Sequence, residues 1–201
     1  VEQSVDQVDA LEATEVPVEL ETTPAGEIAE VDSAHGNEES VVIEVPESQK
    51  VSFDTFDLQT PLRKAIDKLG FEFCTPIQAQ SLVHTLLGHD VTGKAQTGTG
   101  KTAAFLITII NDLLSNPINE KRYLAEPRAL VVAPTRELAI QIASDADLLN
   151  KYSGLHTVTL VGGEDYQKQT RALDERPVDI VVATPGRLLD LIQQRKLSLS
   201  H

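Results

Sequence analysis

The chain has 201 residues and a formal net charge of −14, from 17 basic and 31 acidic side chains. No apolar run approaches the roughly 18 residues that a membrane-spanning helix needs, and the acidic N-terminal part lacks the basic and apolar regions of a secretory signal. Cys74 is the only cysteine, so a disulfide within the chain and a cysteine metal site are excluded. These features predict a cytoplasmic protein. With no methionine and a start at Val1, the sequence is interpreted as part of a longer chain.

The negative charge lies in the first quarter of the chain. Residues 1–50 hold fourteen acids and one base, whereas residues 51–201 hold seventeen acids and sixteen bases. The first segment has no aromatic residue and cannot bury enough apolar surface to offset the entropy lost on ordering. We expect a disordered acidic tail that solvates the protein, with a partner-binding tail as the alternative. The near-neutral remainder excludes nucleic-acid binding through bulk charge.

From Val51 onward the sequence alternates short apolar runs with longer amphipathic stretches. Leu58, Leu62 and Ile66 recur at helical spacing, and Gly70 ends that helix. Beyond it the pattern predicts four strands, at 90–95, 128–133, 156–161 and 178–183, and five helices, at 76–87, 100–114, 135–149, 164–174 and 185–194. Such alternation predicts a parallel sheet with helices on both faces, where ligands bind beyond the carboxyl ends of the strands.

The sequence AQTGTGKT, residues 95–102, joins an expected strand to an expected helix, as a phosphate-binding loop does. Gly98 and Gly100 allow the loop to turn backbone N–H groups inward, and the helix N-terminus adds partial positive charge. Lys101 is expected to reach the β- and γ-phosphates of a nucleotide, and Thr102 to place its hydroxyl on Mg²⁺. The general pattern begins with glycine, whereas this loop begins with Ala95. The flanking strand and helix favour a nucleotide site over a chance match.

A second turn, PTREL at residues 134–138, follows the apolar run ALVVA. Thr135 is expected to cap the next helix, and Arg136 adds a fixed charge suited to phosphate. By itself, this turn is better explained as a capped helix with a surface arginine.

A third turn, TPGRL at residues 184–188, follows DIVVA. Thr184 is expected to cap its helix and Pro185 fits the first helical position, whereas Arg187 lies where a cation opposes the helix dipole. An external anion would offset that cost. Two such turns at one sheet edge, beside a nucleotide loop, predict contacts along a phosphate backbone. Gly162 and Gly163 form a loop that would allow close approach, although by themselves they are better explained as a simple turn.

Together, these segments resemble the DEAD-box family of ATP-dependent RNA helicases. The resemblance covers residues 51–201 and rests on five ordered motifs: GFEFCTPIQ at 70–78 is similar to the Q motif, AQTGTGKT to motif I, PTRELA to motif Ia, Gly162–Gly163 to the GG motif and TPGRL to motif Ib. The stretches CTPIQAQ, GTGKTAAFLI and EPRALVVAPTREL are most similar to the members found in the bacterial RNA degradosome.

The resemblance implies a RecA-like P-loop domain that binds ATP and Mg²⁺. Gln78 would hydrogen-bond the adenine edge, Phe71 would pack on the adenine and Phe53 would support Phe71. By residue type alone, both phenylalanines would be core residues and Gln78 a surface amide. The nucleotide would also contact the phosphate loop, with Lys101 and Thr102 as the catalytic residues and Thr102 as the metal ligand; this loop comprises Ala95, Gln96, Thr97, Gly98, Thr99, Gly100, Lys101 and Thr102.

The resemblance also implies that RNA lies along the strand-end turns. Contacts to phosphates and sugars would give little sequence preference. The residues concerned are Pro134, Thr135, Arg136, Gly162, Gly163, Thr184, Gly186 and Arg187.

In the family, an Asp-Glu-Ala-Asp motif holds Mg²⁺ and positions the attacking water, and a second domain supplies arginines for phosphoryl transfer. Neither lies within these 201 residues, so residues 51–201 are expected to be an incomplete N-terminal RecA-like domain. The complete protein would close two domains around ATP and RNA and separate short duplexes in RNA turnover, joined to a degradosome endoribonuclease through regions outside this chain. The alternatives are a non-catalytic truncated module that binds RNA or a partner, and another P-loop ATPase, such as a DNA-directed helicase; the Q motif argues against the second.

The first prediction concerns activity. We expect the purified chain 1–201 to release no phosphate from ATP in response to RNA, because the water-positioning acids are not among its residues. Detectable RNA-stimulated phosphate release would contradict this.

The second prediction concerns stability. In RecA-like sheets the strands that carry the motifs after TPGRL are central, so residues 51–201 expressed alone would have unpaired edges and exposed apolar faces. We expect a molten or aggregating product. Calorimetry that shows a sharp cooperative transition in a monomer would disprove the expectation.

Overall fold

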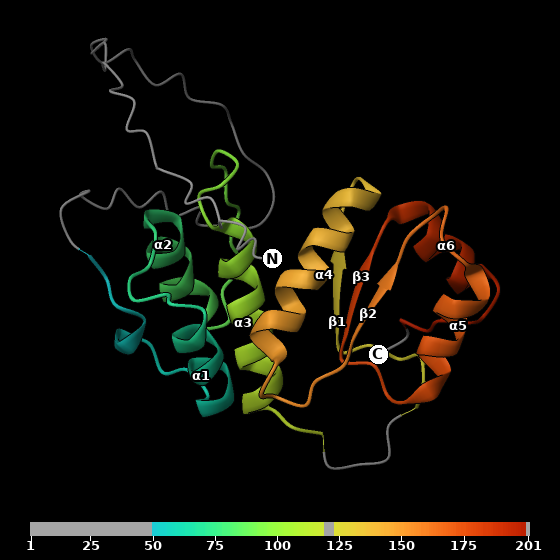
Figure 1. Ribbon diagram of the computed structural model, residues 1–201, viewed down its shortest axis with the longest axis horizontal. Helices are drawn as coiled ribbons and strands as arrows, with labels where there is room; N and C mark the ends of the chain where they lie inside the picture. The colour runs from blue at the N-terminus through green and yellow to red at the C-terminus, as the bar shows by residue number, and fades with distance from the viewer. Residues whose placement is uncertain (1–49, 119–122, 200–201) are drawn as a thin grey trace, which may run out of the picture. The chain divides into compact units, whose positions relative to one another are not determined.

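A computed structural model describes residues 50–118 and 123–199. The acidic tail predicted for residues 1–50 lies outside this part of the chain, except for Lys50. The described residues form a three-stranded parallel sheet with helices on both faces (Figure 1). In chain order the elements are η1 (Phe53–Thr55), α1 (Thr60–Lys68), α2 (Pro76–Thr85), α3 (Lys101–Ser115), β1 (Ala129–Val132), α4 (Arg136–Asn150), β2 (Thr157–Leu160), α5 (Tyr166–Glu175), β3 (Ile180–Ala183) and α6 (Pro185–Gln193).

The sheet has the strand order β1-β3-β2, so the last strand in sequence lies in the middle. Val181 of β3 is in register with Leu130 of β1 and with Val158 of β2. All four residues of β3 are buried, which its uninterrupted apolar sequence IVVA predicts for a strand covered on both faces. β1 is an edge strand of the described sheet, and its Leu130 and Val132 are exposed.

Alternate residues of β3 face two different hydrophobic clusters. Ile180 and Val182 pack with apolar residues of α1, α3 and α4, whereas Val181 and Ala183 pack with Leu173 of α5 and with the buried leucines of α6. This follows from the two-residue period of a strand. The prediction of helices on both faces is confirmed, with α4 on one side of the sheet and α5 and α6 on the other (Figure 1).

The strand predicted at residues 90–95 is wrong, because these residues form an irregular connection between α2 and the phosphate loop. Residues 90–94 are exposed, and Val91 and Ala95 are the only apolar side chains of the six. Gly93 further weakens an extended conformation by its backbone entropy. A strand needs a partner for its backbone groups, and β1, β2 and β3 pair only with one another in the described sheet.

Helix α1 ends at Lys68, just before Gly70 as expected, and α2 ends at Thr85, three residues before Gly88. Gly70 has φ +75° and Gly88 has φ +84°, a left-handed conformation that glycine adopts without a Cβ clash. After Gly70 the chain turns back, and an antiparallel bridge joins Phe73 to Ser52. The side chain of Asn111 in α3 accepts from Gln59 N at 2.8 Å, which fixes the segment that connects η1 to α1. These contacts place the segments of Phe53 and Phe71 side by side.

Among the described residues, no helix combines the length and apolar content required to cross a membrane.

Candidate functional site

The phosphate loop forms a compact turn at the N-terminus of α3. Gly98 has φ +83° and Gly100, the N-cap of α3, has φ +87°. The Lys101 ammonium donates to the carbonyl oxygens of Ala95 and Gln96. The loop therefore holds the Lys101 ammonium close to the N-terminus of α3. A phosphate bound here would contact both the ammonium and the N-terminal N–H groups of α3.

Gln78 connects the loop to α2. Its Nε2 donates to the carbonyl oxygen of Gly100 at 3.1 Å, and its Oε1 accepts from the backbone N of Thr75 at 3.0 Å. Thr75 in turn caps α2 by accepting from Gln78 N, which completes a capping box. Gln78 is therefore buried, not the surface amide that residue type alone favours. In these bonds Nε2 uses one of its two N–H donors and Oε1 uses one of its two acceptor positions. One donor and one acceptor of the amide remain, which is the pair that an adenine edge requires.

The two phenylalanines of the expected adenine site lie together. Their ring centroids are 6.5 Å apart with an interplanar angle of 26°, a stacked arrangement. Phe53 is fully buried, whereas Phe71 is 39% exposed. The buried ring thus supports the exposed one, which has a face available for a flat ligand.

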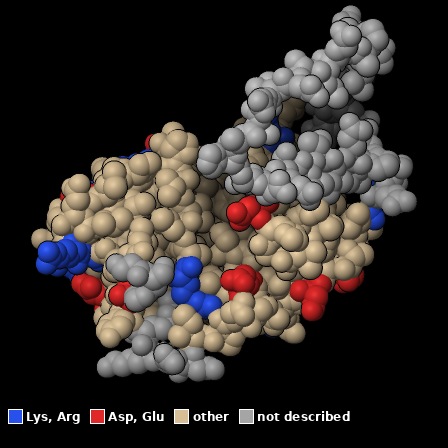
Figure 2. Space-filling view, turned by 180° about the vertical axis from the view of Figure 1, so that it is seen from behind, with Lys and Arg blue, Asp and Glu red and all other residues tan. Residues whose placement is uncertain are grey.

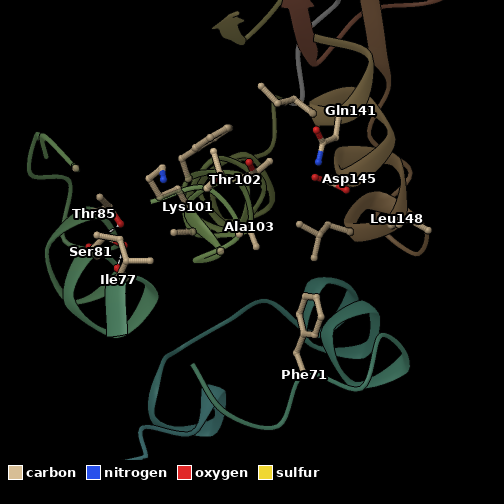
Figure 3. Close-up of a pocket in the computed structure, with 18 of the residues that line it drawn as sticks. Phe71, Ile77, Ser81, Thr85, Lys101, Thr102, Ala103, Gln141, Asp145 and Leu148 are labelled. Carbon is tan, nitrogen blue, oxygen red and sulfur yellow. Dashed lines mark hydrogen bonds between the residues drawn. The ribbon is translucent and has the colours of Figure 1, made fainter. Parts of the chain in front are cut away.

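A cavity of about 740 Å³ lies beside the loop, between α2, α3 and α4 (Figure 3). Six of the eleven residues expected at the nucleotide line this cavity: Phe71, Thr97, Gly98, Gly100, Lys101 and Thr102. The other five do not line it: Phe53, Gln78, Ala95, Gln96 and Thr99. Gln141 and Asp145 also line it from α4, and sequence reasoning missed both. Burial raises the pKa of Asp145 above the usual range of a carboxyl group. Their spacing of four residues places them on one helix face, but only the packing of α4 against α3 brings that face to the cavity.

A second group of predicted residues lies at the carboxyl edge of the sheet. Ala133 N donates to Ala183 O and Thr184 N donates to Leu160 O, both at 2.9 Å, so the three strand ends are tied together. The N-termini of α3 and α4 lie at this same end (Figure 1). Of the eight residues expected to contact RNA, six lie exposed or partly exposed at this edge as backbone or small side chains: Pro134, Thr135, Gly162, Gly163, Thr184 and Gly186.

The cap predictions have different outcomes in the two turns. Thr135 caps α4 by accepting from Leu138 N at 3.2 Å, which confirms the expectation. Thr184 lies at the N-cap position of α6, but its side chain makes no capping hydrogen bond. The expected N-cap position of Thr184 is therefore confirmed, although it carries no side-chain hydrogen bond. Pro185 at the first position has no N–H and its ring already fixes φ, so the helix begins without a side-chain cap.

Two arginines complete this edge. Arg136 pairs with Glu164, and its Nη1 donates to Gly162 O at 3.4 Å. Arg187 donates to the backbone oxygen of Glu164 at 3.4 Å and lies 5.4 Å above the Tyr166 ring. Its Nη1 is buried with no hydrogen-bond partner among the described residues. A buried donor without a partner is costly, so an incoming acceptor would be stabilising there.

Gln169 is a structural residue of this edge that sequence reasoning missed. Its side chain accepts from Val161 N at 3.1 Å and donates to Val161 O at 3.0 Å. This bidentate pairing, at a buried position, fixes the backbone just before Gly162. No sequence signal marks the contact, because α5 must first fold against β2.

Charge does not gather into a broad basic patch on the face shown in Figure 2, where basic and acidic side chains of the described residues are interspersed. Nor does any group of three or more His, Cys, Asp or Glu in the described part of the chain form a metal site.

Comparison with protein families matches residues 75–201 to a family described as DEAD/DEAH box helicase. This match confirms the resemblance stated from the motifs. The matched residues begin at Thr75 and include the phosphate loop and the turns that follow β1, β2 and β3.

Curated relatives point the same way. Proteins named ATP-dependent RNA helicase RhlB from Pseudomonas putida and Pseudomonas aeruginosa are each 56% identical over 154 residues, which is 77% of this chain and 39% of theirs. The RhlB of Shewanella sediminis is 52% identical over 148 residues, 74% of this chain and 34% of its own. This chain thus spans less than two-fifths of these relatives' length. A solved structure described as a hypothetical ATP-dependent RNA helicase from Sulfolobus tokodaii has a TM-score of 0.60 and 34% identity, covering 70% of this chain and 38% of that one.

The environment of Cys74 generates a prediction. Burial raises the pKa of this thiol to about 11 from 9.0, and the positive charge of Arg63 lowers it by less. The thiolate is the reactive form. We therefore expect iodoacetamide to modify Cys74 at pH 8 roughly 100-fold more slowly in the folded chain than in urea.

Mass spectrometry of the peptide that carries Cys74 measures the rate in the longest native chain with this sequence. The folded rate should still be rising above pH 9.0, where the ordinary thiol is already half ionised. Equal rates with and without urea would contradict the burial.

Proposed function

This chain belongs to the DEAD/DEAH box helicase family, and we propose that it binds ATP between the Q motif and the phosphate loop and binds RNA along the carboxyl edge of its sheet. In the complete protein, these two sites would couple ATP hydrolysis to the local separation of RNA strands. The one observation that supports the proposal most directly is the hydrogen bond from Gln78, the residue proposed to read adenine, to Gly100 of the phosphate loop.

The nucleotide would lie in the cavity beside the loop. Its adenine would stack on the exposed face of Phe71 and bond the remaining positions of the Gln78 amide. The N–H groups at the start of α3 and the Lys101 ammonium would hold the phosphates, taking the place of the carbonyls that Lys101 now contacts. The Thr102 hydroxyl, in the first turn of α3, would bind Mg²⁺, which when bound would neutralise phosphate charge.

RNA would follow the strand ends. Arg136 and Arg187 would pair with phosphates, since a guanidinium matches two phosphate oxygens. The exposed glycines of the turns would let the RNA backbone approach closely. No base-reading pocket is needed for such contacts, so we expect little sequence preference.

We propose RNA turnover as the process served, with an endoribonuclease as a partner that binds outside these residues. The support is the similarity to proteins named RhlB. A cytoplasmic location is part of the same proposal and agrees with the free, half-buried thiol of Cys74.

The test of the nucleotide site is Gln78→Ala in the longest native chain with this sequence. We expect ATP affinity to fall about 5- to 30-fold, because a buried amide contact is lost. Binding of fluorescent ATP and GTP analogues by anisotropy measures both affinities. The variant should also bind the ATP and GTP analogues with equal affinity.

The matched control is Gln80→Ala, two positions along the same helix, where the side chain is only partly buried and does not line the cavity. It should leave both affinities within about twofold. A Gln78→Ala protein that still prefers ATP over GTP would refute adenine reading, even if its overall affinity fell through loss of the capping box.

A further inference from the structure

We infer that Glu164 is a built-in competitor of RNA phosphate, which neutralises Arg136 in the absence of RNA and so sets the affinity of this edge. The inference rests on the proposed RNA-binding function. Glu164 lies directly after Gly162–Gly163 and belongs to none of the motifs that the sequence singled out.

Glu164 contacts both arginines of the edge. Its carboxylate pairs with the Arg136 guanidinium, and its backbone oxygen accepts from Arg187. The same Arg136 guanidinium also donates to Gly162 O. Glu164 thus contacts both of the arginines that would bind neighbouring phosphates.

Gly163, directly before Glu164, leaves room for the Arg136 guanidinium. A Cβ at Gly163 would lie 2.8 Å from Arg136 Nη1, closer than real Cβ atoms approach other atoms. Gly163 also has φ +75°. The loop therefore provides the space into which the arginine side chain folds back onto Glu164.

A carboxylate on a guanidinium occupies the same donors that a phosphate uses. Glu164 holds the Arg136 Nη2 donor, so a phosphate that pairs through this nitrogen must displace the carboxylate. Both side chains are about two-fifths exposed, at 40% and 44%. An ion pair so open to water is weak, which makes Glu164 displaceable: it would lower the affinity without preventing binding.

The two arginines differ in how they are held. Arg187 rests on the Tyr166 ring and keeps its charge, whereas the charge of Arg136 is cancelled by Glu164. Arg187 would therefore bind the first phosphate. The exchange at Arg136 would follow, with the displaced carboxylate released into solvent.

The experiment is Glu164→Gln in the longest native chain with this sequence, measured by anisotropy on a labelled single-stranded oligouridine with a non-hydrolysable ATP analogue. At low salt we expect about 2- to 5-fold tighter binding than wild type, the range that an exposed ion pair sustains. The slope of log affinity against log salt should stay within about 0.7 of the wild-type slope, the contribution of one phosphate contact on a single strand, because Arg136 pairs with phosphate in both proteins once Glu164 is displaced.

The matched control is Asp174→Asn, which makes the same charge change at an exposed position near the other end of α5. It should leave RNA affinity unchanged. In a background of Arg136→Ala, Glu164→Gln should give no gain, because the cation it releases is absent.

The outcomes separate the two claims. Wild-type protein that fails to bind RNA would overturn the proposed function and this inference with it. Wild-type binding with an unchanged or weaker Glu164→Gln would overturn the inference alone and leave Glu164 as a scaffold for the arginines. An equal gain in Asp174→Asn, or a gain that persists with Arg136→Ala, would also overturn it, by assigning the effect to net charge.

Discussion

The amide of Gln78 holds two helix N-termini against each other, and the candidate nucleotide site depends on that contact. Thr75 is the N-cap of α2 and Gly100 is the N-cap of α3; Gln78 bonds the backbone of both. A Cβ at Gly100 would collide with the Gln78 amide, so the approach requires glycine. Helix N-termini carry partial positive charge, and bringing two together is unfavourable unless an anion lies between or beside them. The arrangement therefore favours phosphate electrostatically even before Lys101 is counted.

The carboxyl edge of the sheet uses a different principle. Parallel pairing places the ends of β1, β2 and β3 at one level, and the backbone bonds beyond them keep the three turns together. Each turn adds small or exposed groups, while Arg136 and Arg187 reach across to the turn after β2. The local charge is thus created by convergence of separate segments, which is consistent with a body whose overall charge is near neutral.

The sequence predicted those parts of the structure that depend on local patterns. The runs around Val131, Val158 and Val181 form strands, as expected for short segments in which apolar residues alternate with polar ones or follow one another directly. The run at 90–95 has the right neighbours in sequence but too few apolar side chains and no partner strand among those described, so its local signal was misleading. Motif residues could be placed on turns because glycine, proline and threonine act within a few residues.

Contacts between distant segments could not be predicted in this way. Gln78 and Gly100 are 22 residues apart, and Arg136 and Glu164 are 28 apart. Residue type alone makes Gln78 a surface amide and Glu164 one of many acids. The burial of the first and the pairing of the second arise only when α2 meets α3 and when the turn after β2 meets the start of α4.

Helix α4 belongs to both candidate sites, which bears on how they could influence each other. Its first residue, Arg136, lies at the carboxyl edge, and Gln141 and Asp145, further along the same helix, line the cavity beside Lys101. A helix is rigid over 15 residues, and its buried side packs on both α3 and the sheet through Ile142, Ala146 and Leu149. A ligand that displaced α4 in the cavity would therefore move Arg136 relative to Glu164 as well. The exchange of a carboxylate for a phosphate on Arg136 would in turn change the forces on the helix start. The two sites would be coupled directly by this route, because residues of both lie on the single helix α4.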